Sequence, residues 1–260
     1  MSCRNVQEHT LIYRLILIAL VLLHDIAEIN ADLKWDQVRF KGLNPNEDYN
    51  INMGSGFFVN DDTIVTNAHV VSNCVNIAIR GAVKPQTAEL YTIDPELDLA
   101  LLKTSPSEVK VPYIRNNYNT INEGDILFSV GYPLEHADSG QYIIKEAKVI
   151  RVFKDPKTEF SKLEFTDNVN NGNSGGPLLD KNSNLVGVVT AKHRYYDRKN
   201  PEITTREVAV AIGVEGLQKF LRLHNVAFAS SSSYDMFTNY AVDSKAKNYV
   251  VNIHCIRLSN

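Results

Sequence analysis

From Asn52 onward, the chain alternates short apolar runs with residues that favour turns. Across residues 75–80, for example, Val and Ile occupy every second position, Asn, Ala and Arg lie between them, and Gly81 follows. A period of two is typical of a strand with one buried face. We therefore expect a half-buried strand over residues 75–80.

Similar runs recur along most of the chain. Each is rich in β-branched or aromatic residues and is bounded by Gly, Pro, Asn or Asp. Many short strands at such spacing favour a sandwich or barrel over alternating strands and helices. The sequence thus predicts an all-β fold. The further runs lie at residues 54–59, 63–71, 88–94, 99–104, 125–133, 142–153, 162–167, 184–191 and 206–213.

One segment has the periodicity of a helix instead. Residues 214–224 place Leu217, Phe220, Leu221 and His224 on one face and polar residues on the other. After this predicted helix, residues 229–235 read as a short flexible linker. The tail then contains one more strand candidate, residues 249–256, which could pair back onto the main domain.

The N-terminus carries an apolar stretch over residues 11–23, interrupted by Arg14. It is short for a membrane-spanning helix, which needs about 20 residues, and it suits a secretory signal peptide. Cleavage after Ala31 fits the small residue at that position. We expect export through residues 1–31, as a cleaved signal or a retained anchor. The alternative is a buried N-terminal helix.

Export would make the three cysteines relevant. Cys3 would leave with a cleaved signal, so that the mature chain keeps Cys74 and Cys255. An oxidising compartment permits a bridge between these two, but the sequence does not give the distance between their Cα atoms. We expect two separate buried thiols and leave the bridge open.

Composition excludes some functions and leaves others. With 44% hydrophobic and 22% charged residues, the chain of 260 residues has the composition of a globular protein with a sizeable core. A net charge of −3 gives no electrostatic footprint for nucleic acid. The four histidines at 136, 193, 224 and 254 lack partners at metal-ligand spacing, so we expect no metal and no cofactor.

Three polar residues at strand edges are candidates for chemistry. His69 follows an apolar run, Asp98 precedes the run Leu99–Leu102, and Ser174 lies in the stretch GNSGGPL at residues 172–178. Alone, each is more often structural: a satisfied His, a turn Asp and a loop Ser. Together they supply a nucleophile, a base of near-neutral pKa and a carboxylate that fixes the tautomer of the base.

The glycines around Ser174 also have a chemical use. Glycine lets a loop adopt dihedral angles that other residues avoid. The backbone N–H groups of Gly172 and Ser174, and that of Asn173 between them, could then converge on an oxyanion. Such donors stabilise the tetrahedral intermediate of acyl transfer.

The stretches TNAHVV, DLALL and GNSGGPLLD resemble the three active-site blocks of trypsin-like serine peptidases, and are most similar to the HtrA/DegP branch. The blocks occur in the same order and at similar spacing, and the resemblance covers about residues 54–223. It implies two six-stranded β-barrels with a C-terminal helix and a site in the cleft between them. It makes His69 the general base, Asp98 its orienting carboxylate and Ser174 the nucleophile, with an oxyanion hole from Gly172, Asn173 and Ser174.

The resemblance also suggests where a substrate binds. Residues 187–191, with Val188, Val189, Thr190 and Ala191, resemble the segment that pairs with the substrate backbone and lines the specificity pocket. Asn168 lies six residues before the nucleophile, where trypsin itself holds an Asp. We therefore expect a small or medium apolar P1 residue rather than Lys or Arg.

Two departures from the family pattern stand out. Only about 35 residues follow the predicted helix, too few for the PDZ domain usual in HtrA proteins. Residues 192–205 form a long, charged loop that could cover the pocket, bind a partner or form a solvated hairpin. The expected organisation is a signal peptide or anchor (1–31), a leader (32–51), a protease domain (52–226) and a linker with a tail (227–260).

The sequence thus predicts an exported serine endopeptidase, periplasmic or secreted, that acts on unfolded or misfolded polypeptides in protein quality control. The alternatives are a processing protease of narrow specificity and a chaperone-like binding protein on a peptidase fold. Membrane association through residues 11–23 is open, as is a homotrimer. Residues 33–40, with Trp35, could serve trimerisation, or be a strand or a disordered leader.

Overall fold

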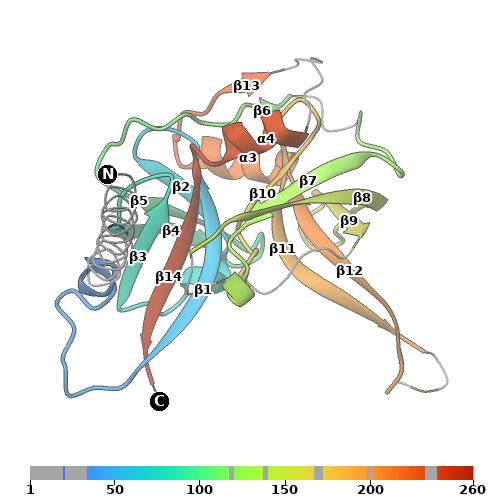
Figure 1. Ribbon diagram of the computed structural model, residues 1–260. Helices are drawn as coiled ribbons and strands as arrows, with labels where there is room; N and C mark the ends of the chain where they lie inside the picture. The colour runs from blue at the N-terminus through green and yellow to red at the C-terminus, as the bar shows by residue number, and fades with distance from the viewer. Residues whose placement is uncertain are drawn as a thin grey trace, which may run out of the picture.

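The structure is a computed structural model that describes residues 20, 34–116, 120–136, 140–166, 172–197, 200, 202–231 and 239–259. Its strands form two closed six-stranded barrels, which lie side by side in Figure 1. The predicted all-β fold with two six-stranded barrels is therefore confirmed. The expected signal or anchor, residues 1–31, lies outside the described residues except for Leu20. Among the described residues, no helix is long and apolar enough to cross a membrane.

Barrel 1 has the strand order β1-β14-β3-β4-β5-β2. Its large buried side chains include Phe57, Ile79 and Leu101, and this core continues beneath the helix α3. Its strands are β1 (Tyr49–Phe58), β2 (Thr63–Thr66), β3 (Asn76–Gly81), β4 (Gln86–Asp94), β5 (Leu99–Lys103) and β14 (Val250–Leu258).

Barrel 2 has the order β10-β7-β8-β9-β12-β11 and closes through the pairing of β10 with β11. A separate core fills it, with Leu127, Phe165 and Val189 among its members. Two short strands, β6 (Ile114–Arg115) and β13 (Ser230–Ser231), extend the sheet beyond β11. The barrel strands are β7 (Ile126–Gly131), β8 (Ile143–Lys154), β9 (Ser161–Thr166), β10 (Pro177–Leu179), β11 (Leu185–Tyr196) and β12 (Thr204–Gly213).

The described helices are short. The predicted helix at residues 214–224 is confirmed as α3 (Val214–Leu223), whose apolar side chains Leu217, Phe220 and Leu221 are buried. A one-turn helix, α2 (Ala68–Val71), a 3₁₀ turn, η2 (Leu134–His136), and α4 (Asn239–Ala246) were not predicted. Short helices like α2 and η2 leave too little periodicity in the sequence to be recognised.

The last strand, β14, lies between β1 and β3 and pairs antiparallel with both (Figure 1). The strand candidate at residues 249–256 is therefore confirmed, and it does pair back onto the main domain. Both neighbours are distant in sequence, because β1 begins at Tyr49 and β3 ends at Gly81. Barrel 1 thus takes one of its six strands from the segment expected to be a linker and tail.

The same insertion brings the two cysteines together. Cys255 on β14 is paired in register with Ile77 on β3, and it forms a disulfide with Cys74, at a Cα–Cα distance of 5.3 Å. The expectation of two separate buried thiols was therefore wrong. It failed because the pairing depends on where β14 lies, and residues 181 positions apart in sequence carry no local signal of contact.

Residues 34–39 are helical and pack on the outside of barrel 1, where Trp35 is only 4% exposed. Its ring meets that of His254 edge to face, at a centroid distance of 4.9 Å, and Arg80 lies over the Trp35 ring. Burial, together with the charges of Arg39 and Arg80, lowers the pKa of His254 to about 3. Trp35 is therefore committed to its own chain, and this segment is neither a strand nor a disordered leader.

The packing of residues 34–39 on barrel 1 also changes the burial expected for the strand at residues 75–80. Ile77, Ala78 and Ile79 are all buried, whereas Val75 is exposed and precedes β3. Ala78 pairs with His254 in register, on the face over which Trp35 lies. The strand is thus buried on both faces at its centre, which a simple alternation does not predict.

Strands β11 and β12 continue past barrel 2 as a projecting hairpin (Figure 1). The described residues of 192–205 therefore belong to a hairpin, which is one of the three alternatives. At its base lies Glu164 of β9, which is 0% exposed and accepts hydrogen bonds from Arg151 (2.7 Å) and Tyr195 (2.6 Å). Burial raises the pKa of Glu164, but these bonds and the charges of Arg151 and Arg206 outweigh it, so that the net pKa is lowered.

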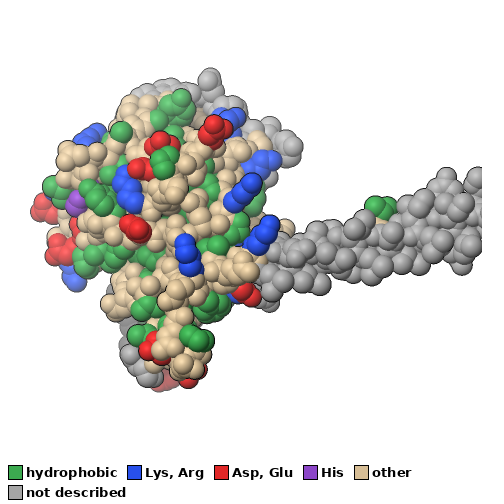
Figure 2. All heavy atoms as spheres, turned by 90° about the vertical axis from the view of Figure 1, so that its left-hand side faces the viewer, with side chains coloured by type: hydrophobic (Ala, Val, Ile, Leu, Met, Phe, Trp, Pro, Cys, Tyr) green, Lys and Arg blue, Asp and Glu red, His purple; other side chains and the backbone are tan. Residues whose placement is uncertain are grey.

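The face of the molecule seen in Figure 2 carries basic and acidic side chains interspersed. No large region of one charge sign is visible on it. This mixture agrees with the small net charge of −3.

Candidate active site

His69 is presented by the one-turn helix α2, directly after strand β2. The other three residues of the helix, Ala68, Val70 and Val71, are buried, so the helix is anchored and His69 is left at the surface. Asn67 precedes the helix and donates from its side-chain amide to the Asp98 carbonyl at 2.8 Å. The base of α2 is thereby fixed to the start of β5.

Asp98 stands just before β5 in the left-handed region, with φ of 53°. Asp is one of the few residues that tolerates this conformation. Its carboxylate faces α2: the His69 ring Nδ1 lies 2.8 Å from Oδ2 and 3.0 Å from Oδ1, and the His69 backbone N–H donates to Oδ1 at 3.0 Å. The expected pairing of His69 with Asp98 is thus present.

A third donor reaches the same carboxylate from barrel 2. The Thr190 hydroxyl donates to Asp98 Oδ2 at 2.5 Å. Burial raises the pKa of Asp98, but the hydrogen bonds from His69 and Thr190 together outweigh it and hold the pKa below its usual range. Asp98 is therefore a carboxylate near neutral pH and can stabilise a protonated His69 ring.

Ser174 joins the site through the same threonine. Its Oγ donates to the Thr190 carbonyl at 2.9 Å. Within the described residues, no hydrogen bond joins this hydroxyl to the His69 ring. Thr190 therefore connects the acid and the serine: its side chain binds Asp98 and its backbone binds Ser174.

The glycines of the Ser174 loop are required by space as well as by backbone conformation. Gly172 has φ of +97°, and a Cβ there would lie 2.4 Å from the Tyr132 carbonyl oxygen. Gly175 has φ of +86°, and a Cβ there would lie 2.2 Å from the Ser55 carbonyl oxygen. Any other residue at either position would be strained and would clash with fixed backbone.

Ser55 of β1 ties this loop to both barrels. Its hydroxyl donates to the Gly172 carbonyl at 2.7 Å and accepts from the Tyr132 N–H at 2.8 Å. Its backbone N–H donates to the Ser174 carbonyl at 2.8 Å. The carbonyls of Gly172 and Ser174 are thus held by Ser55.

The backbone N–H groups of the loop divide into two sets: Gly175 donates to the Val189 carbonyl at 2.8 Å and Gly176 to the Asn173 carbonyl at 2.9 Å, whereas the three before them are unpaired within the described part of the chain. Among the described residues, the N–H groups of Gly172, Asn173 and Ser174 have no acceptor. Unpaired N–H groups next to a serine hydroxyl are the feature that an oxyanion hole needs.

The residues expected to contact substrate fall into three groups. Asn168 lies outside the described residues. The side chains of Val188 and Val189 are 0% exposed and belong to the hydrophobic cores, so they line no pocket and give no support for an apolar specificity pocket. Thr190 supports Asp98 and Ser174, as described above, and the backbone of Ala191 pairs with Val210 of β12.

Sequence reasoning missed several supports of this site. Thr190 was expected to bind substrate, and Asn67 and Ser55 were given no role. Ser55 did have a weak signal, because it lies between two glycines. A Cβ at Gly54 would lie 2.5 Å from the Val70 side chain, so this strand approaches α2 closely. Among the described residues, no group of three or more metal-ligating side chains is present.

Comparisons with known proteins agree with this geometry. The family described as trypsin-like peptidase domain matches residues 54–188, which include His69, Asp98 and Ser174. The magnetosome formation protease MamE of Magnetospirillum gryphiswaldense is 33% identical over 146 residues, which are 54% of this chain and 19% of that protein. A probable periplasmic serine endoprotease, DegP-like, of Brucella suis is 30% identical over 170 residues, 63% of this chain and 33% of that protein. The chain thus spans a third or less of the length of these two relatives.

Solved structures share the fold at lower identity. The active form of the Rv3671c protease of M. tuberculosis aligns with a TM-score of 0.54 and 22% identity, over 68% of this chain and 76% of that chain. The HtrA-type protease AlgW with a tripeptide aligns with a TM-score of 0.52 and 18% identity, over 68% of this chain and 62% of that chain. The matched family domain covers more than half of the sequence, from β1 into β11, and the chain therefore belongs to the trypsin-like peptidase family.

Proposed function

We propose that the protein is an exported serine endopeptidase that cleaves polypeptides through a covalent acyl-enzyme. Ser174 is the nucleophile, His69 the general base and Asp98 the carboxylate that orients it. The N–H groups of Gly172, Asn173 and Ser174 bind the oxyanion. The chemistry that each group offers, and the hydrogen bonds described above, support these roles.

The reaction begins when the Ser174 hydroxyl turns from the Thr190 carbonyl toward Nε2 of His69. Ser174 Oγ attacks the scissile carbonyl carbon while its proton passes to Nε2. The tetrahedral intermediate collapses, the C–N bond breaks, and the proton moves from His69 to the leaving amine. A water molecule then attacks the acyl-enzyme, with His69 again taking and returning the proton, and releases the new carboxyl end.

One observation carries the proposal. Nδ1 of His69 lies within 3.0 Å of both oxygens of Asp98, which Thr190 holds from the opposite barrel. A half-buried carboxylate so placed fixes the tautomer that leaves Nε2 free to accept a proton. A structural ion pair would not need the serine loop to be tied to the same threonine.

The proposed substrates are unfolded or misfolded proteins. This part rests on the similarity to HtrA-type proteins, and the preference for an apolar P1 residue rests on the family alone, since Val188 and Val189 are buried. A digest of a peptide library measures the preference directly. Cleavage mostly after Lys or Arg would contradict it.

The proposed location is the periplasm or the extracellular space. The Brucella suis relative is named a probable periplasmic serine endoprotease, and the disulfide between Cys74 and Cys255 suits an oxidising compartment. Membrane association would come from residues 11–23, which lie outside the described residues, and fractionation of cells tests it. Sedimentation of the purified chain tests the homotrimer, for which Trp35 is not available as a contact.

The decisive experiment compares the chain with its Ser174→Ala variant. Each is incubated with unfolded casein and with a fluorophosphonate probe, which labels an activated serine. Labelling and cleavage by the parent alone support the proposal. Labelling without casein cleavage favours a processing protease of narrow specificity. Casein binding without labelling by either chain favours the chaperone-like alternative and contradicts the peptidase.

A further inference from the structure

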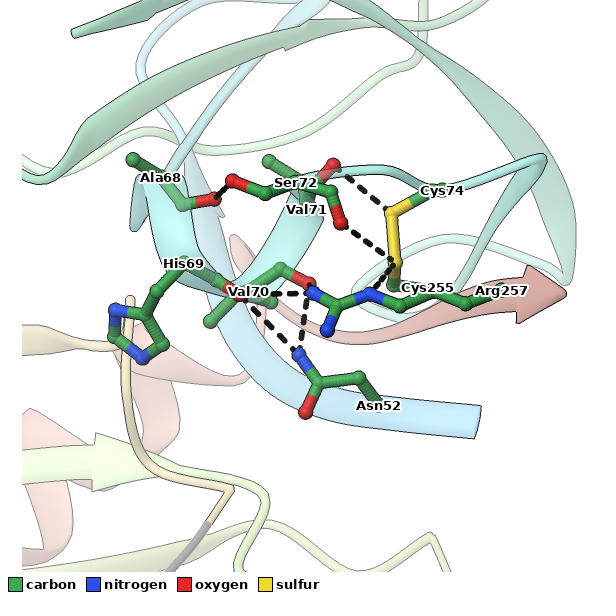
Figure 3. The surroundings of a disulfide bond; sticks show 9 residues. All are labelled: Asn52, Ala68, His69, Val70, Val71, Ser72, Cys74, Cys255 and Arg257. Atoms are coloured by element: carbon green, nitrogen blue, oxygen red, sulfur yellow. Dashed lines mark hydrogen bonds between the residues drawn. A yellow bond between two sulfur atoms is a disulfide. The ribbon is translucent and has the colours of Figure 1, made fainter. Parts of the chain in front are cut away.

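The helix that carries His69 is too short to satisfy its own carbonyl groups. The last four carbonyls of any α-helix lack intrahelical partners, and α2 has only four residues, Ala68–Val71. Side chains from three parts of the chain supply donors instead (Figure 3). The Ser72 hydroxyl donates to the Ala68 carbonyl at 2.6 Å.

The next two carbonyls are shared by donors from β1 and β14. The Asn52 amide donates to the Val70 carbonyl at 3.0 Å and to the His69 carbonyl at 3.4 Å. The Arg257 guanidinium donates to the His69 carbonyl at 3.0 Å and to the Val70 carbonyl at 3.4 Å. Asn52 and Arg257 thus approach the same pair of carbonyls, one on each strand of a neighbouring pair.

Arg257 is itself held in place. It lies two residues after Cys255, whose disulfide to Cys74 joins β14 to the turn that follows α2, and its Nε donates to the Cys255 sulfur at 3.3 Å. A planar guanidinium has several donors in fixed directions and can bind two carbonyls and a sulfur at once. Figure 3 shows Arg257 between the disulfide and the carbonyls of His69 and Val70.

We propose that Arg257 is a positioning residue for His69: its Nη2 bonds to the His69 and Val70 carbonyls set the place of the α2 backbone, and hence of the imidazole beside Asp98. This inference rests on the proposed peptidase function. It gives β14, a strand from far along the chain, a part in catalysis although β14 supplies none of the proposed reacting groups.

The consequence for kinetics is specific. A displacement of about 1 Å in a catalytic group can cost about 100-fold in rate. Since Arg257 acts on the base and not on the substrate, its loss lowers kcat and leaves KM nearly unchanged. A residue that served only overall stability would change neither constant at a temperature where the protein is folded.

The test uses the full chain with Arg257→Gln and Arg257→Lys, and Arg222→Gln as the matched control. Arg222 is an exposed arginine on α3 that bonds Gln218 within the same helix. We expect kcat on a peptide substrate to fall about 10- to 100-fold in Arg257→Gln, with KM within about twofold. Arg257→Lys keeps the charge but loses the Nε bond to the Cys255 sulfur that holds the side chain, so its kcat falls between wild type and Arg257→Gln. Arg222→Gln matches wild type.

Hydrogen exchange gives a readout independent of turnover. In Arg257→Gln, the amides of residues 66–72 exchange faster, while those of α3 keep their rate. Wild-type kcat together with unchanged exchange in a folded Arg257→Gln chain overturns the inference. If that chain does not fold, Arg257→Lys decides alone: an unchanged kcat overturns the proposal, and a lowered kcat at unchanged KM supports it.

The two proposals fail in different ways. If wild type neither reacts with the fluorophosphonate probe nor cleaves any peptide, the peptidase function itself is contradicted. If wild type reacts and the Arg257 variants react equally fast, only the positioning role is contradicted.

Discussion

The Thr190 hydroxyl donates a hydrogen bond of 2.5 Å to Oδ2 of Asp98, across the boundary between the two barrels. Thr190 is on β11 of barrel 2, and Asp98 immediately precedes β5 of barrel 1. The carboxylate that bonds His69 is therefore also bonded by the barrel that carries Ser174. The relative position of the barrels is thereby linked to the geometry of the site.

Replacing Thr190 by Val tests this link, because it removes the hydroxyl and keeps the shape. Asp98 retains its bonds from His69 but loses one of three donor groups, which leaves a largely buried carboxylate oxygen underbonded. We expect kcat/KM to fall about tenfold and the free energy of unfolding to fall by about 1–3 kcal/mol. Kinetics and urea denaturation measure the two effects.

Thr205→Val is the matched control for this change. Thr205 also donates a side-chain hydrogen bond, to the Tyr195 carbonyl, but on the exposed hairpin. Equal losses from both variants would mean that Thr190 contributes no more than any threonine of a β-strand.

Gly172→Ala tests the serine loop. An added Cβ would lie 2.4 Å from the Tyr132 carbonyl oxygen and 2.8 Å from the Leu134 nitrogen, both backbone atoms, so the loop must move. We expect kcat to fall about 100- to 1000-fold, as when a donor of an oxyanion hole is lost. The rate of fluorophosphonate labelling measures the same loss directly.

Gly42→Ala separates this clash from backbone strain. Gly42 also has a positive φ, +73°, but a Cβ there meets nothing within 4 Å. It should cost about 1 kcal/mol of stability and leave kcat unchanged. A Gly172→Ala enzyme as active as Gly42→Ala would refute the assigned place of the oxyanion hole.

The disulfide offers a stability prediction. Cys74 and Cys255 close a loop with a sequence separation of 181 residues. A double Cys74→Ser, Cys255→Ser variant should lose about 2–5 kcal/mol of unfolding free energy. Denaturation in guanidinium measures the loss. Reductant should lower the denaturation midpoint of wild type toward that of the variant and leave the midpoint of the variant unchanged. Equal midpoints for wild type and variant, each with and without reductant, would contradict the prediction.

Glu164 gives a prediction that depends on pH. Its folded pKa lies below the unfolded value of about 4.3, so its stabilising effect is complete above that value and is lost as the pH falls through the folded pKa. We expect Glu164→Gln to be less stable than wild type by about 1–3 kcal/mol at pH 7, because solvent around the half-exposed Arg151 screens part of the attraction. The difference should shrink below about pH 4.

Urea denaturation between pH 3 and pH 7 follows this difference. Glu207→Gln is the control, since Glu207 pairs with Arg194 on the exposed hairpin and should matter by less than about 1 kcal/mol at any pH. A Glu164→Gln deficit that stays constant down to pH 3 would show that packing, and not charge, is its cause.

The parts of the fold that depend on local pattern were predictable. Alternating residues indicated most strands, and the periodicity of residues 214–224 indicated α3. The structure also brings the three expected reactive residues together. His69 bonds Asp98, and the Asp98 carboxylate and the Ser174 hydroxyl both bond Thr190.

What the sequence did not reveal depends on pairing between distant segments. The position of β14 between β1 and β3 determines the disulfide, the burial of Ala78 and the contacts of Arg257. A strand pattern indicates that residues 249–256 are extended, but it does not indicate their neighbours. For the same reason the pattern does not reveal that the side chains of Val188 and Val189 are both buried, each in a different hydrophobic core.

The place of β14 also affects when the molecule can first assemble during its synthesis. Barrel 1 lacks the strand between β1 and β3 until residues 250–258 have left the ribosome. All six strands of barrel 2 have been synthesised before that point. Contacts between such distant segments form late, because the closure of a long loop must precede them. A nascent chain therefore carries His69 on a barrel that is not yet closed, and the surroundings of α2 are complete only when β14 is in place.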